Sequence, residues 1–381
     1  MSGMGTMTAA TIDGALVFGI TLALLGRLKL EALRLPTQLG ARLQALHLAM
    51  IPLISIGGLL LDIYGVRAIL VFGSALLAVG LCGLSLRPTH PYAAVSILLA
   101  GFGATALGTA SIVLMPQAFF APEETTASLN LGFVFLALGA LLTPLLADIL
   151  LEKIELRRTL AVFALLALTP AFLAVLPSGE HWPTGERAGE SATFWAEPAM
   201  WLAALMLFFY APLEAAISLW TFTLLAERGQ DESEATGLLY GFWAAFVSSR
   251  LLVALAQHLD FLTEAWDRVL IVAPTLLAAV LLGNLAGASR GGRYRLGLLL
   301  LGLLLGPVLP TLLGLLFRHV AANEQGLAYG LVFAFGSLGS MLLAPILTMR
   351  TQPPLQTALR MPIFLALVVT AVALVMGLMT P

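Results

Sequence analysis

Long apolar runs, separated by short polar segments, recur along the whole chain. Twelve runs in the sequence have about 20 residues each, the length that an α-helix needs to cross the hydrocarbon core of a bilayer. The predicted spans cover residues 11–30, 39–61, 66–86, 92–115, 127–150, 158–176, 197–222, 236–257, 267–287, 295–317, 326–348 and 361–379. This pattern predicts an all-α membrane protein with twelve transmembrane helices.

The longest polar stretch, residues 177–196, lies close to the midpoint of the 381-residue chain. Pro177 and Pro183, together with several Gly and Ser residues, are typical of a loop rather than a helix. We therefore predict an N-terminal six-helix bundle at 1–176, an inter-bundle linker at 177–196, and a C-terminal six-helix bundle at 197–381.

Composition narrows the class of protein further. Hydrophobic residues make up 60% of the chain and charged residues 10%, whereas soluble domains contain about 25% charged residues. This composition and the net charge of −2 argue against a soluble enzyme and a nucleic-acid binder. The single cysteine, Cys82, excludes a disulfide framework and a cysteine-based zinc site. No Walker lysine motif is present, so we expect no ATP-driven activity, no enzyme, no cofactor and no metal.

The two predicted halves share a pattern of glycine and proline. Span five has Gly132 followed by Pro144, and span eleven has Gly330 followed by Pro345. The two glycines are 198 residues apart. Spans four and ten match as well, since each has a glycine eight residues before a proline, which is Pro310 in span ten. Glycine lets helices approach closely and proline permits bending, which are properties that two halves moving against each other need.

The loop after span two carries a recognisable motif. It reads GLLLDIYGVR and resembles the loop 2–3 signature of the major facilitator superfamily, G-x-L-x-D-R-x-G-R-R/K. The matching positions are Gly58, Leu60, Asp62, Gly65 and Arg67. Two basic positions of the signature are apolar here, at Ile63 and Val66. The resemblance implies that this loop, with Arg250 and the prolines of the repeat, belongs to the gating and structural framework.

Further motifs resemble the branch of the superfamily that contains fucose–proton and glucose permeases. They are Asn130 with Phe135, Gly139 and Pro144 in span five; Tyr210, Glu214, Ser218 and Trp220 in span seven; Gly241, Phe242, Trp243 and Arg250 in span eight; and Gly306, Pro307, Pro310 and Thr311 in span ten. The resemblance implies two six-helix bundles, a central solute cavity and alternating access. It also implies a sugar–proton symporter.

Span seven carries a polar stripe. Tyr210, Glu214 and Ser218 are spaced by four residues and share one helical face. An ionisable group within a bilayer costs about 2.5–3.5 kcal/mol on insertion scales, so it usually marks function or pairing. Glu214 is therefore a candidate for proton coupling or for binding solute hydroxyl groups, and the alternative is a carboxylate paired for structural reasons.

Span eight places Tyr240, Trp243 and Arg250 on one face. The two aromatic rings could stack against a sugar, or could lie at the membrane interface as aromatic residues often do. Arg250 could pair with Glu214, although its position along the predicted helices is six residues deeper, or roughly 9 Å at 1.5 Å per residue. The alternative is that Arg250 extends toward the membrane surface.

Three more polar residues are candidates. His47 and Gln44 lie three residues apart in span two, and His47 could titrate near neutral pH and couple protons. Asn130 in span five could bind the solute or tie two helices together. Spans one and four, in contrast, are expected to hold no carboxylate in their middle, where the resemblance to fucose permeases would place coupling acids.

Taken together, these features predict a secondary transporter for a small polar solute, with a monosaccharide as the leading candidate. Its expected partners are the solute, protons and the lipid bilayer, and we expect a monomer. Two alternatives stay open. One is an efflux or organic-anion carrier, favoured by arginines after span one, and the other is a non-transporting membrane sensor on the same fold.

The orientation in the membrane is contested by two signals. The family resemblance places both termini and the Asp62–Arg67 loop in the cytoplasm, and the protein in the inner or plasma membrane. On the predicted spans, however, four Lys and Arg residues lie on that side and fourteen on the other, with Arg250 within the bilayer. The positive-inside rule therefore favours the opposite orientation. We predict cytoplasmic termini from the resemblance.

Overall fold

The computed structural model describes residues 5–27, 39–86, 92–185, 193–227, 232–286, 291–348 and 355–379, and these are almost entirely helical. The α-helices are α1 (Thr6–Arg27), α2 (Leu39–Tyr64), α3 (Val66–Leu86), α4 (Tyr92–Ala118), α5 (Thr125–Lys153), α6 (Leu156–Leu166), α7 (Thr169–Val175), α8 (Pro198–Glu227), α9 (Glu232–His258), α10 (Val269–Ala286), α11 (Gly291–Leu305), α12 (Val308–His319), α13 (Gln325–Thr348) and α14 (Leu355–Met379). Three short 3₁₀ helices complete the described structure: η1 (Thr193–Ala196), η2 (Glu264–Trp266) and η3 (Ala322–Glu324).

Each of the twelve predicted spans corresponds to helix in the structure. Within the described residues, eleven spans are long and apolar enough to cross a membrane, and α2 supplies the twelfth, of which Ile51–Tyr64 meets the apolar criterion. Spans six and ten are each divided in two, as α6 with α7 and as α11 with α12. The predicted all-α, twelve-helix fold is confirmed.

The chain forms two compact units. The first comprises Met1–Pro122, Gly132–Ala192 and Ala321–Leu331, and the second comprises Glu123–Leu131, Thr193–Val320 and Val332–Pro381. The first turns of α5 therefore cluster with the second unit, and the first turns of α13 cluster with the first unit. The predicted division at residues 177–196 stays a proposal.

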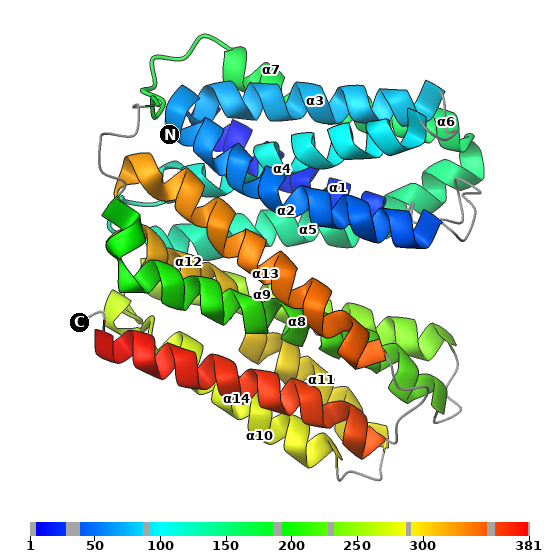
Figure 1. The fold of residues 1–381 in the computed structure, drawn as a ribbon, viewed down its shortest axis with the longest axis vertical. Helices are drawn as coiled ribbons and strands as arrows, with labels where there is room; N and C mark the ends of the chain where they lie inside the picture. Colours follow the sequence, from blue (N-terminus) through cyan, green and yellow to red (C-terminus); the bar gives the residue numbers. More distant parts are fainter. Residues whose placement is uncertain are drawn as a thin grey trace. The chain divides into compact units, whose positions relative to one another are not determined.

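The first unit is organised around α3 and α4, which lie side by side (Figure 1). Small residues allow this approach, because a Cβ atom on Gly73 would lie 2.5 Å from the Leu107 nitrogen. Such close packing is typical of membrane helices, where van der Waals contact between backbones replaces the hydrophobic effect. Helices α1, α2, α6 and α7 pack around this pair.

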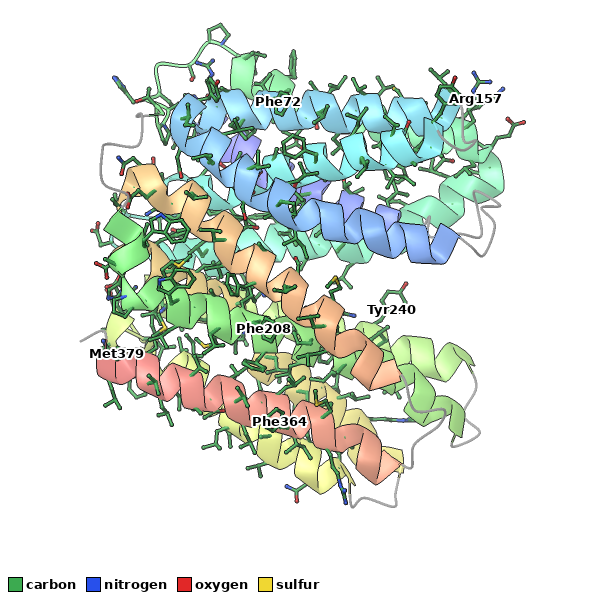
Figure 2. All side chains as sticks on the ribbon, in the orientation of Figure 1. Phe72, Arg157, Phe208, Tyr240, Phe364 and Met379 are labelled. Atoms are coloured by element: carbon green, nitrogen blue, oxygen red, sulfur yellow. The ribbon has the colours of Figure 1, made fainter. Side chains whose placement is uncertain are left out.

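In the second unit, α14 packs on α10 and α8, and α9 packs on α11. Large apolar side chains on the outer faces remain uncovered, among them Phe364 at 54% and Met379 at 55% relative exposure (Figure 2). A helix that is apolar all round suits a lipid environment, since water would be a poor solvent for these faces.

Candidate functional site

The second unit contains a polar cluster formed by α8, α9 and the break between α11 and α12. Glu214 on α8 interacts electrostatically with Arg250 on α9 and hydrogen-bonds with Tyr210, which lies one turn before it on α8. Tyr210 is 1% exposed and Arg250 is 4% exposed, whereas Glu214 is half-buried. The structure therefore brings together the carboxylate, the cation and the hydroxyl that the sequence singled out.

The break in span ten anchors this cluster, and proline is its cause. In a continuous helix the Gly306 carbonyl would accept a hydrogen bond from the N–H group four residues later, but Pro310 has none. Arg250 fills that vacancy, since its Nε donates to the Gly306 oxygen at 2.8 Å. The Tyr210 hydroxyl donates to the neighbouring Leu305 oxygen at 2.7 Å. The break thus supplies two backbone acceptors for the polar side chains of α8 and α9.

The question left open for Arg250 is thereby answered. Its side chain is buried in the unit rather than extended to the surface, and its charge interacts with that of Glu214. A long side chain spans the axial offset between the two residues. The Arg250 guanidinium also lies over the Phe246 ring, with its Cζ 4.3 Å from the ring centroid. A cation in this position gains from the ring quadrupole as well as from the carboxylate.

Aromatic rings continue the same face of α9. Trp243 packs edge-on against Phe246 with ring centroids 5.2 Å apart, and it also contacts Phe242. Trp243 is half-buried. Tyr240, labelled in Figure 2, is 46% exposed. Stacking of these rings against a solute stays a prediction.

Asn130 lies in the first turns of α5, within the second unit, and is fully buried. Its Nδ2 donates to the Thr126 backbone oxygen at 3.0 Å and to the Thr311 hydroxyl on α12 at 3.5 Å. Its Oδ1 is buried with no hydrogen-bond partner among the described residues. Asn130 therefore ties α5 to α12, while one acceptor atom remains unused.

Several candidates lie outside the described side chains. The backbone at these positions is helical, but their side-chain contacts are not described. They are Gln44, His47, Pro144, Ser218 and Pro345. Their predicted roles stay predictions.

The last turns of α2 cap the first turn of α13, which clusters with the first unit. Asp62 is 5% exposed and accepts hydrogen bonds from the backbone N–H groups of Gly326 at 2.9 Å and Leu327 at 2.7 Å. These groups belong to the first turn of α13, where a helix has no internal acceptors and carries a partial positive charge. Gly58 permits the approach, because any Cβ there would collide with the Gly326 carbonyl.

Gly65 and the start of α3 pack on α7 and on the segment that follows it. Gly65 has a φ of +85°, a left-handed conformation that favours glycine, and it ends α2. The Arg67 Nε donates to the Ala174 oxygen at 2.7 Å, and its Cζ lies 5.6 Å from the Trp182 ring centroid. The beginning of the predicted linker is therefore packed against the first unit.

A second buried network was not predicted. Asp267, fully buried, accepts hydrogen bonds from the Thr126 hydroxyl at 2.7 Å, from Gln257 at 2.7 Å and from Arg318 at 2.6 Å. Glu264 adds an ion pair with Arg318 at 3.2 Å. The internal repeat does not point to Asp267, which lies 205 residues after Asp62, whereas the repeated glycines of spans five and eleven are 198 residues apart.

One expectation about span one is wrong. The helix begins at Thr6, five residues before the predicted start, so Asp13 lies well inside α1 and not at its edge. Span one therefore does carry a carboxylate within the membrane. Span four carries none, as expected from its sequence.

Comparisons with known proteins agree with this architecture. The profile of the Major Facilitator Superfamily matches residues 4–344. No curated protein matches the chain in sequence. Among solved structures, the E. coli fucose:proton symporter FucP superposes with a TM-score of 0.80 at 16% identity, with 97% of this chain and 98% of that chain covered.

Two further solved structures are similar. The human organic anion transporter MFSD10 gives a TM-score of 0.74 at 15% identity, covering 97% of this chain and 99% of that one. The proton:xylose symporter XylE gives 0.75 at 13% identity, covering 99% and 95%. At these identities the likeness is one of fold, and the resemblance to the major facilitator superfamily is confirmed by the match of the family profile.

Proposed function

Because this chain belongs to the major facilitator superfamily of membrane transporters, we propose that it is a secondary transporter for a small polar solute, with a monosaccharide as the leading candidate. The solute would cross by alternating access, and the proton gradient would drive its accumulation. The proposal places the solute near Glu214, Tyr210 and Trp243, with Asn130, Tyr240, Ser218, Gln44 and His47 as further candidates.

The observation that carries this proposal is the Glu214–Arg250–Tyr210 cluster. Glu214 keeps more exposed surface than Tyr210 and Arg250, which are buried, and it is the member of the cluster that can bind and release a proton. Carboxylates accept hydrogen bonds from sugar hydroxyl groups, and the positive charge of an adjacent arginine favours the charged form of a carboxylate. Protonation would cancel the charge that holds Arg250, and this is how proton binding could reach the break in span ten.

The framework residues have proposed roles as well. We assign residues 1–176 and 197–381 to the two moving halves, with 177–196 as their linker. Gly58, Asp62, Gly65 and Arg67 would hold the loop after α2 in place during the cycle. Pro144, Pro310 and Pro345 would provide the bending points.

A solute screen tests the proposal directly. Purified protein is heated with a panel of monosaccharides and organic acids, and each hit is then assayed for uptake into proteoliposomes with and without a pH gradient. Stabilisation by a sugar, followed by gradient-driven uptake, is the expected result. Uptake of organic acids would favour the organic-anion or efflux carrier. The organic anion transporter MFSD10 has a similar fold. Absence of any binding or uptake would favour a non-transporting sensor.

Cysteine labelling resolves the orientation. Glu123 and Arg157 are exposed and flank the two ends of α5, so they lie on opposite sides of the membrane. With the exposed Cys82 replaced by Ser, cells carrying Glu123→Cys or Arg157→Cys are treated with an impermeant maleimide. Cytoplasmic termini predict labelling of Arg157→Cys in intact cells and of Glu123→Cys after lysis. The reverse pattern would establish the orientation that the positive-inside count favours.

A further inference from the structure

The end of α9 and the start of α5 are joined by an ion pair that the proposed function does not use. His258 is the last residue of α9, and Glu124 is the residue before α5. The His258 Nδ1 and the Glu124 Oε2 are 2.8 Å apart, although the two residues are 134 positions apart in the chain. Both residues belong to the second unit. The pair therefore fixes the start of α5 to the end of α9.

The pair suits the two helix ends that it connects. A helix carries a partial negative charge at its C-terminal end and a partial positive charge at its N-terminal end, so a cation is favoured at the first and an anion at the second. A protonated His258 and an ionised Glu124 meet both preferences, and they form a charge-assisted hydrogen bond. A neutral imidazole loses the attraction between opposite charges, and it donates to Glu124 only in the tautomer with the proton on Nδ1.

A second connection between the same helix ends lies beside this pair and is buried. Gln257 on α9 and Thr126 on α5 both donate to the fully buried Asp267, each at 2.7 Å. The side chain of His258, in contrast, is 44% exposed and that of Glu124 is 27% exposed. Of the two connections, the ion pair is thus the one whose groups exchange protons with the solution.

Other ionisable groups lie on the elements around this end of α9. They are Glu123, Glu197, Asp260 and Glu264, which carry negative charge; Arg268 and Arg318, which are bound to the Gly377 oxygen and to Asp267; and His319, whose Nδ1 lies 2.8 Å from the Leu315 oxygen. The ionisable residues of α11, which also packs on α9, lie at its start and so beside the opposite end of α9. The charge that faces His258 at hydrogen-bond distance is that of Glu124.

We infer that His258 and Glu124 form a proton-sensitive latch, which is closed when His258 is protonated and loosened when His258 is neutral. Histidine changes charge between about pH 5 and 8, whereas a glutamate side chain titrates at lower pH. Within that range Glu124 stays ionised, so the latch strengthens as the pH falls and weakens as the pH rises. The buried connection through Asp267 holds the same helix ends at either pH.

The consequence of the latch for transport rests on the proposed function. There, α5 belongs to the half formed by residues 1–176 and α9 to the half formed by residues 197–381, so the latch joins the two moving halves. It lies next to Glu123, on the cytoplasmic side in the orientation that we propose. Protons delivered with the solute would acidify that side and close the latch, which would slow the next cycle. The latch would then act as a feedback brake on uptake.

Spin-label distances measure the latch without a solute or a gradient. Labels are attached to Glu123→Cys and Phe261→Cys, two exposed positions beside the pair, with Cys82 replaced by Ser. The reconstituted full chain is measured at about pH 5.5 and at about pH 8, near the two ends of the histidine range. We expect a short distance to dominate at the lower pH. A longer distance should gain about two- to fivefold in population at the higher pH, the size expected for an exposed ion pair.

Three further variants of the labelled protein assign the response to this pair. His258→Gln and Glu124→Gln should each give the same distance distribution at both pH values. His319→Gln, which removes the neighbouring histidine on α12, should keep the full response. The latch is refuted if the labelled protein does not respond to pH, or if it responds equally after His258→Gln.

Exchange assays separate the latch from the transport function. In a Glu214→Gln background, counterflow without a gradient should be about two- to fivefold slower at the lower pH, and adding His258→Gln should remove this dependence. Equal slowing by acid with and without His258 would exclude the brake. A pH-dependent distance in a protein that shows no counterflow of any solute would uphold the latch and count against the proposed transport function.

Discussion

Replacing Glu214 by glutamine is expected to abolish proton-driven accumulation of the solute while leaving solute exchange intact. Glutamine keeps the length of the side chain and can still hydrogen-bond with Tyr210, so the solute site should persist. It cannot take up or release a proton. Accumulation in proteoliposomes with an imposed pH gradient should fall to the external concentration, and counterflow without a gradient should continue.

The matched control for this variant is Glu123→Gln, which removes a carboxylate from an exposed position before α5. Accumulation by this control should equal that of the wild type. Wild-type accumulation by Glu214→Gln would exclude Glu214 as the coupling group. Loss of both accumulation and exchange would instead assign Glu214 to solute binding or to the integrity of the cluster around Arg250.

The spans and the polar stripe could be predicted from the sequence because both depend on local properties. A run of about 20 apolar residues has few alternatives to a membrane helix, and a spacing of four places Tyr210 and Glu214 on one face whatever surrounds them. The pairing of Glu214 with Arg250 could not be decided in the same way. It depends on how far a flexible side chain reaches and on a carbonyl made available by Pro310 in a third helix.

Asp13 was missed for a different reason. The residues from Thr6 to Thr11 are mostly Thr and Ala, which are less apolar than the residues that follow Asp13, so hydropathy alone sets the start of span one too late. A shift of five residues moves a carboxylate from the membrane surface to the interior. Helix ends are the least certain part of any sequence-based assignment, and in a membrane protein that uncertainty changes the predicted chemistry of each residue near the boundary.

The network around Asp267 could not be assembled from sequence because its members come from separate elements. Thr126 is on α5, Gln257 on α9 and Arg318 on α12, and each contributes a donor to one buried carboxylate. The arrangement parallels that of Asp62, which holds the first turn of α13 through backbone N–H groups. Asp267 holds the first turns of α5 by accepting a hydrogen bond from a threonine hydroxyl, and it also accepts one from an arginine. Both carboxylates therefore fix the start of a helix, but they do so with different donors.

Asp267→Asn is accordingly expected to cause the largest loss of stability among single substitutions at described positions of this network. It removes the negative charge opposite Arg318 and turns one acceptor into a donor that faces other donors. Removing one partner of a buried ion pair costs about 3–5 kcal/mol. The thermal unfolding midpoint in detergent should fall markedly. It is measured as the temperature at which half of the monodisperse protein is lost after heating.

Glu264→Gln is the matched control, because it alters the other carboxylate that Arg318 contacts. The Glu264 side chain is 52% exposed, against 0% for Asp267, and exposed ion pairs contribute about 0–1 kcal/mol. Its midpoint should therefore stay close to that of the wild type. A double variant, Asp267→Leu with Arg318→Met, should recover part of the loss, since it removes the stranded charge together with its partner. Equal midpoints for Asp267→Asn and Glu264→Gln would mean that the buried charge of Asp267 does not stabilise the fold. The first turns of α5 would then be held by the packing of Gly314 against Thr126 and by the Asn130–Thr311 contact.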